Sequence, residues 1–119
     1  MAGAPDAAAA AATELEGTAA TYGSPTLLAA AKHALGAVAL ATGAKDQAIA
    51  HLIAARQLWQ TTHAPYEQAH ARALLAEAHH NVGDRESSLV ELRAAHATFE
   101  RLGAEPAATA SARRLQELV

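Results

Sequence analysis

The chain of 119 residues contains no cysteine, and its aromatic residues are limited to one tryptophan, one phenylalanine and two tyrosines. Without cysteine it can form neither a disulfide nor a thiolate metal site, and it lacks a cysteine nucleophile. Its 9 Lys and Arg residues against 12 Asp and Glu residues give a formal charge of −3 at pH 7. Such a chain lacks the positive field that nucleic-acid binding requires, so we expect no nucleic-acid partner.

The sequence also lacks a hydrophobic run long enough to cross a membrane. Hydrophobic residues make up 51% of the chain, but most of them are alanine. The longest alanine run, over residues 7–12, is far shorter than the ~20 apolar residues that span a bilayer. Asp6 stands where a signal peptide has Lys or Arg. We therefore expect a cytoplasmic chain with no membrane partner.

The abundance of alanine and leucine, with few β-branched residues, favours helix throughout. An alanine face buries little area per residue, so the helices must lie close together to form a core. A chain of this length holds one domain. The composition predicts a single all-α domain over residues 1–119.

A repeat of 40 residues organises the chain, and internal repeats decide the fold of such sequences. Shared alanines carry little weight here, whereas matched proline, glycine, leucine and aromatic residues in one register are specific. Those matches place Pro25 on Pro65, Leu35 on Leu75, Gly43 on Gly83, Leu52 on Leu92 and Trp59 on Phe99. After one extra residue, Pro106 opens a third copy that the end of the chain cuts short.

Each copy predicts two antiparallel helices, about six in the whole chain. Ser24 is a good N-cap, Pro25 suits the first helical position, and Gly43 ends the first helix. The remaining helices are expected over residues 6–22, 45–61, 65–83, 85–102 (capped by Asp84) and 106–118. The organisation is then a half unit 6–23, units 24–63 and 64–104, and a partial unit 105–119.

Two stripes of apolar residues at helical spacing mark the core-facing sides of the second helices. They consist of Ala48, Leu52, Ala55 and Trp59, and of Leu89, Leu92, Ala95 and Phe99. Tyr66 is expected at the joint between the two units. Because each helix pair buries its stripe only against neighbours, the ends of the array are expected to be apolar and to favour self-association, as in a homodimer.

The pattern within each unit resembles the tetratricopeptide repeat. The residues that carry the resemblance are Leu35-Gly36, Gly43, Ala48, Leu52 and Ala55, and then Leu75-Ala76, Gly83, Ser88, Leu92 and Ala95. The small residues let helices approach closely. The chain departs from the family in two ways: Lys32 and Arg72 replace a bulky residue, and the period is longer than the usual 34 or so. The resemblance implies helix pairs whose first helices line a concave face.

A narrower resemblance covers nearly the whole chain. Its residues are Thr21-Tyr22-Gly23-Ser24-Pro25, Leu58-Trp59, Ala64-Pro65-Tyr66-Glu67, Gly83-Asp84 and residues 99–104. They are similar to the helical array of large bacterial regulators of the LuxR type and of related ATPase- or cyclase-containing regulators. The resemblance implies a protein-interaction or signal-relay module in transcription regulation. The chain has no phosphate-binding loop of the Walker type, so ATP chemistry is expected elsewhere.

By transfer from the tetratricopeptide family, the concave face provides the candidate binding site for a protein or peptide partner. Its expected residues are His33, Ala37 and Leu40 from the first unit, flanked by Ala30 and Ala41, and His70, Ala73, Glu77, His80 and Asn81 from the second. The histidines would make binding sensitive to pH between about 5 and 8. The alternative interpretation is that these positions form only a solvated helix face.

The 7 histidines raise the alternative of a metal-binding or small-ligand bundle that uses His33, His70, Glu77 and His80. Glu77 and His80 form a Glu-x-x-His motif, but such sites need a facing copy, and the 40-residue shift places Ala37 and Leu40 there. We expect neither a metal nor another cofactor. A third alternative is a purely structural dimerisation piece.

No catalytic constellation is visible. The serines stand at cap or helix positions, without a nucleophile elbow or a Ser-x-x-Lys motif. Asp84 and Glu86 fall at an expected helix start, where capping explains them. We predict that the chain is not an enzyme.

Overall fold

The computed structural model describes residues 4–119, with side chains from Asp6 onward. Within this range the chain forms six α-helices and no strand, which confirms the all-α class and the expected number of helices. The helices are α1 (Ala4–Tyr22), α2 (Pro25–Thr42), α3 (Lys45–Thr61), α4 (Pro65–Asn81), α5 (Arg85–Leu102) and α6 (Glu105–Leu118). Residues 1–3 of the predicted domain lie outside the described range.

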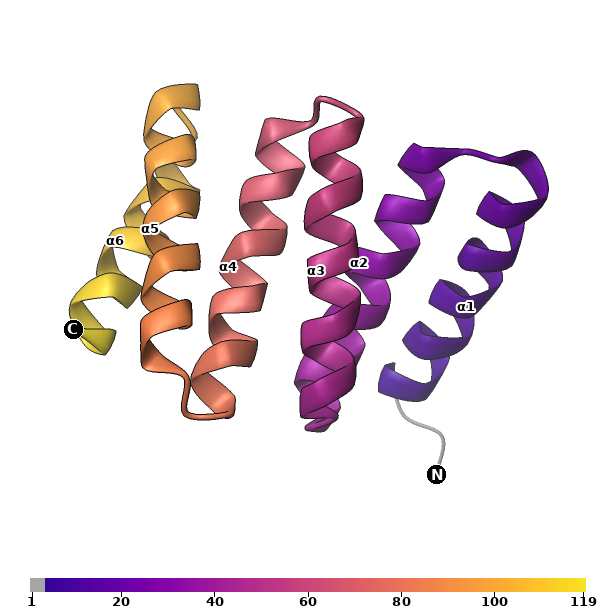
Figure 1. Cartoon of the computed structure of the whole chain (residues 1–119), viewed down its shortest axis with the longest axis horizontal. Helices are drawn as coiled ribbons and strands as arrows, with labels where there is room; N and C mark the ends of the chain where they lie inside the picture. The colour runs from indigo at the N-terminus through magenta and orange to yellow at the C-terminus, as the bar shows by residue number, and fades with distance from the viewer. Residues whose placement is uncertain (1–3) are drawn as a thin grey trace.

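The helices lie side by side in chain order, with the two ends of the chain at opposite ends of the row (Figure 1). Each helix contacts the next one along the chain, and α2 also contacts α4. The bounds of α3 and α5 agree with the predicted ranges. None of the helices in the described range is both long and apolar enough to span a bilayer.

The five connections share one type of helix ending. Each contains one residue with positive φ: Gly23, Gly43, His63, Gly83 and Gly103. The N–H of the following residue then donates to the carbonyl five positions earlier, at 2.9–3.1 Å, from Ser24 to Ala19, Ala44 to Ala39, Ala64 to Trp59, Asp84 to His79 and Ala104 to Phe99. This is the bonding pattern of a Schellman C-cap, in which glycine is the preferred residue.

Because these turns are equally spaced, helices α2 to α6 begin every 20 residues, at positions 25, 45, 65, 85 and 105. The extra residue expected before the last copy is therefore not needed, since α6 begins at Glu105 and holds Pro106 within its first turn. Helix α4 ends at Asn81, before the predicted Gly83. The predicted N-caps are confirmed: the Ser24 hydroxyl accepts from the Leu27 N–H and the Asp84 carboxylate accepts from the Ser87 N–H.

The core follows the two predicted stripes, and all eight of their residues are buried: Ala48, Leu52, Ala55, Trp59, Leu89, Leu92, Ala95 and Phe99. Alanines from the first helices face them, with Ala29, Ala31, Ala69 and Ala71 at 0–1% exposure. Leu52 and Leu75 share one cluster with three buried alanines, and Trp59 packs with three buried alanines in another. A core of this composition depends on short distances between helix axes.

At Gly36, α2 approaches α3 closely. A methyl group at this position would lie 2.5 Å from Leu52 Cγ and 2.6 Å from Leu52 Cδ2. Leu52 is fully buried, so its side chain has no free space into which to move. The sequence prediction that small residues permit close helix approach is confirmed at this position.

A buried carboxylate joins three helices. Glu91 of α5 is 6% exposed, and it accepts hydrogen bonds from Arg56 of α3 and from Arg72 of α4, the latter at 2.9 Å. Such a group is tolerated in a core only when it is paired and hydrogen-bonded. Arg72, one of the two departures from the tetratricopeptide pattern, is therefore a structural residue here.

Gly36→Ala tests the close approach. We expect this substitution to lower the free energy of unfolding by about 1–3 kcal/mol through overpacking, although alanine is the better helix former. Gly17→Ala is the matched control, because an added methyl group there meets nothing within 4 Å; we expect it to raise the stability by up to about 1 kcal/mol. Urea unfolding followed by circular dichroism measures both values. A stabilising Gly36→Ala would contradict the packing described here.

His63→Gly tests the turn geometry. His63 has a φ of 56° where the other four turns have glycine, and a side chain in this region costs on the order of 1–2 kcal/mol. The substitution removes this cost, but glycine also has greater conformational freedom in the unfolded chain, which offsets part of the stabilisation. We expect a net stabilisation of about 0.5–1 kcal/mol in the same assay. The reverse change, Gly43→His, serves as the control and should destabilise the protein.

Candidate functional site

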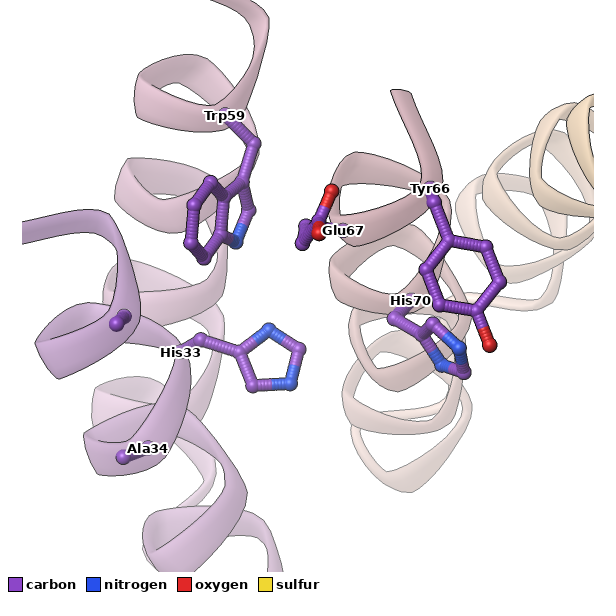
Figure 2. A pocket seen from close by; sticks show the side chains of 7 residues that line it. His33, Ala34, Trp59, Tyr66, Glu67 and His70 are labelled. Carbon is purple, nitrogen blue, oxygen red and sulfur yellow. The ribbon is translucent and has the colours of Figure 1, made fainter. Parts of the chain in front are cut away.

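A pocket of about 280 Å³ opens between α2, α3 and α4 (Figure 2). Alanine methyl groups and ring carbons form most of its wall. The lining residues are Ala30, His33 and Ala34 from α2, Trp59 from α3, and Tyr66, Glu67 and His70 from α4. Its volume suits one amino-acid side chain or a small ring, since pockets for drug-sized ligands start at about 300 Å³.

The local sequence explains how these side chains meet. Pro65 begins α4, so Tyr66 and Glu67 fall on its first turn, and His70 lies one turn further along the same face. Trp59 is near the end of α3, and the turn through His63 reverses the chain between them. The pocket therefore forms where the two units meet.

Three rings form one wall of the pocket and its support. The Tyr66 and His70 ring centroids are 4.6 Å apart, and those of His70 and Phe99 are 5.0 Å apart, both in edge-to-face geometry. Tyr66 also meets Phe99 at 5.8 Å. Such contacts stabilise ring positions beyond simple burial. Tyr66 is predicted at the joint between the two units. Its side chain lines the pocket that lies between these units, whereas the rings that it contacts, His70 and Phe99, belong to its own unit.

Two ring nitrogens at the pocket have no hydrogen-bond partner among the residues that the structure describes. They are Trp59 Nε1 and His33 Nδ1, both shielded from solvent. Figure 2 shows the two rings one above the other, each with this nitrogen on the side turned toward the other ring. Trp59 as a whole is only 8% exposed. A buried polar atom without a partner costs on the order of 1–3 kcal/mol. This cost is removed when a bound group supplies the missing partners.

The surroundings of His33 favour the neutral form of its ring. Burial lowers the pKa of His33, and the nearby His70 lowers it further. At neutral pH its ring therefore carries one donor nitrogen and one acceptor nitrogen. A neutral histidine beside the Trp59 N–H gives the pocket a matched donor and acceptor.

The structure divides the predicted concave-face residues among several places. His33 and His70 come together in the pocket. Ala73 and Glu77 line a second cavity of about 190 Å³ between α4, α5 and α6, where Glu77 accepts two hydrogen bonds of 2.8 Å from Arg114. The other predicted residues lie outside both cavities: Leu40 packs against a core cluster, Ala37 is half-buried on α2, and His80 and Asn81 are exposed at the end of α4.

The alternative site of His33, His70, Glu77 and His80 is not assembled, because Glu77 is paired with Arg114 and His80 lies at the exposed end of α4. In the part of the chain that the structure describes, no three His, Asp or Glu side chains are grouped closely enough to hold a metal ion.

Sequence reasoning missed four lining residues: Ala34, Trp59, Tyr66 and Glu67. Trp59 was assigned to the core, where most of its ring lies, but its N–H edge faces the pocket. Glu67 and His70 form a second Glu-x-x-His spacing. That spacing was the available signal, since it places both side chains on one face of α4.

Acidification tests the environment of His33. Its pKa is lowered in the folded chain, whereas the unfolded chain keeps a value of about 6.5. As the pH falls below about 6.5, the unfolded state therefore binds more protons and the free energy of unfolding decreases. We expect His33→Ala to reduce this loss between pH 7.5 and 5.5 in urea unfolding. His80→Ala, at an exposed position of α4, is the control; an unaltered pH dependence in His33→Ala would show that His33 is not responsible.

Comparison with known proteins gave no relative. No protein-family profile, curated protein or solved structure matches the chain. The tetratricopeptide and LuxR-type resemblances therefore rest on the residues quoted from the sequence. The function of the pocket is inferred from its own side chains.

Proposed function

We propose that the chain is a non-catalytic interaction module of tetratricopeptide type, which binds a segment of a protein partner in a groove lined by its first helices, α2, α4 and α6. The observation that carries this proposal is the apolar pocket with two unpartnered nitrogens between α2, α3 and α4. The pocket includes His33 and His70, two of the residues that the repeat pattern assigns to partner binding.

The second cavity supports a continuous groove. Ala73, Leu74 and Ala110 line it, and they stand 40 residues after His33, Ala34 and His70, which line the pocket. The two hollows therefore occupy equivalent places in successive units. In the second cavity the Glu77–Arg114 pair links α4 to α6. The pocket between α2, α3 and α4 is therefore the more accessible place for a partner side chain.

A repeated polar cluster supports the 40-residue period. In the second copy the cluster consists of Arg56, Arg72 and Glu91. The positions 40 residues earlier hold Glu16, Lys32 and His51. Glu16 pairs with Lys32, and His51 lies near both: burial, and then Lys32, lower the pKa of His51, whereas Glu16 acts to raise it. The same three repeat positions therefore hold interacting polar groups in both copies, and each cluster joins two neighbouring units.

The motif resemblance extends the proposal to a biological role. We propose that the module belongs to, or is related to, bacterial transcription regulators of the LuxR type, where it would receive or relay a signal. Catalysis and DNA binding would then reside in other parts of such regulators. The partner is a protein or peptide, and a second copy of this chain is one of the candidates that the test distinguishes.

A peptide-display selection on the immobilised chain tests the proposal. The pocket is filled by Ala34→Leu, which introduces the residue that the equivalent position 74 carries. The matched control is Ala50→Leu, at an exposed position of α3. We expect selected peptides to lose about tenfold or more in affinity for the Ala34→Leu variant and to bind the control as tightly as the wild type.

Two outcomes would overturn this proposal. Peptides that bind all three proteins equally would place the interaction outside the pocket. A selection without enriched peptides, together with concentration-dependent dimerisation in sedimentation equilibrium, would instead favour the structural dimerisation piece. Tyr22, which is 78% exposed at the end of α1, would then be the first residue to examine.

A further inference from the structure

We propose that the pocket between α2, α3 and α4 recognises the phenol ring of a tyrosine side chain in the partner, next to a basic residue. This inference rests on the proposed interaction function and names the chemistry of the segment that is bound. The tyrosine ring fills the apolar pocket, and its hydroxyl meets the two unpartnered nitrogens.

One hydroxyl group satisfies both nitrogens at the same time. Trp59 Nε1–H is a donor only, whereas neutral His33 offers an acceptor at Nδ1 when its proton is on Nε2. A phenol oxygen accepts from the Trp59 N–H while its own proton is donated to His33 Nδ1. In Figure 2 each nitrogen lies on the side of its ring that is turned toward the other ring, so one hydroxyl placed between the rings is directed at both.

Other side chains fit this pair less well. A phenylalanine or leucine fills the apolar volume but leaves both nitrogens without partners, at the cost that unsatisfied buried groups carry. An ammonium or guanidinium group has no acceptor for the Trp59 N–H. A carboxylate accepts from Trp59, but it is repelled by the Glu67 carboxylate that lines the same pocket.

The walls of the pocket suit an aromatic ring. Tyr66 and His70 already stand edge-to-face with each other, and such ring arrangements extend readily to a third ring. Ala30 and Ala34 leave room on the α2 side, within a volume of about 280 Å³. A single phenol ring occupies this volume without displacing α2 from α3.

Glu67 indicates the neighbouring residue of the partner. It is exposed on the first turn of α4, and within the described residues it forms no ion pair, unlike Glu16, Glu77 and Glu91. The chain as a whole carries a formal charge of −3. A lysine or arginine beside the tyrosine is therefore attracted to the rim of the pocket.

The test uses the full chain, labelled with ¹⁵N, and two matched peptides. These are acetyl-Gly-Tyr-Lys-amide and acetyl-Gly-Phe-Lys-amide, which differ only by the hydroxyl group. Because the chain has one tryptophan, the indole N–H of Trp59 gives a single resolved resonance. We expect the tyrosine peptide to shift this resonance saturably and to bind about tenfold or more tightly than the phenylalanine peptide.

Variants chosen from the repeat assign the effect to the two nitrogens. Trp59→Phe introduces the residue found at the equivalent position 99, and His33→Ala the residue at position 73. Each variant should bind the two peptides with nearly equal affinity. Glu67→Gln should weaken binding of the tyrosine peptide by about 2- to 5-fold, and it should not change binding of a peptide in which glycine replaces the lysine.

The outcomes separate this inference from the proposed function. Equal affinity of the two peptides for the wild-type chain overturns the hydroxyl assignment, and the interaction function still stands if selected peptides depend on Ala34. An indole resonance that does not move at saturation shows that the bound hydroxyl does not contact Trp59 Nε1, and it also overturns the inference. Free p-cresol that binds as tightly as the tyrosine peptide identifies a small phenol, not a protein side chain, as the occupant.

Discussion

The distance between neighbouring helices is the constraint on which this structure depends. Alanine is the most abundant apolar residue, and it buries so little area that helices stabilise one another only at close approach. At Gly36 the approach to Leu52 leaves no room for a methyl group. The few large residues, Leu52, Leu75 and Phe99, are then enclosed almost completely. A charged group placed in so thin a core needs partners on other helices, as Glu91 has in two arginines.

Local signals in the sequence predicted most of the fold. Ser24 and Asp84 accept the hydrogen bonds expected of N-caps, and the predicted bounds of α3 and α5 agree with the structure. These features depend on a few adjacent residues and on helical periodicity, which a single sequence displays directly. The turn at His63 was harder to anticipate, because histidine there adopts a conformation that usually requires glycine.

The candidate site was predicted only in part, since it depends on groups that are distant in the sequence. His33 and His70 were expected on one face, and both line the pocket. Periodicity places Trp59 in the core, but it does not show whether the indole N–H finds a partner there. Similarly, Glu77 was expected to face a binding groove, and the sequence gives no sign that Arg114, 37 residues later, binds it. Such pairings follow from the packing of α4 against α6.

The two polar clusters have a consequence for how the array assembles. At equivalent positions the acidic group is on the first of three helices in one copy (Glu16) and on the third in the next (Glu91). If a helix docked one unit out of register, Lys32 would meet Arg56, or Glu16 would meet Glu91, and like charges would lie side by side. Uniform alanine surfaces could not prevent such slippage. The inverted order of charges therefore gives each interface its own identity and favours one arrangement of otherwise similar units.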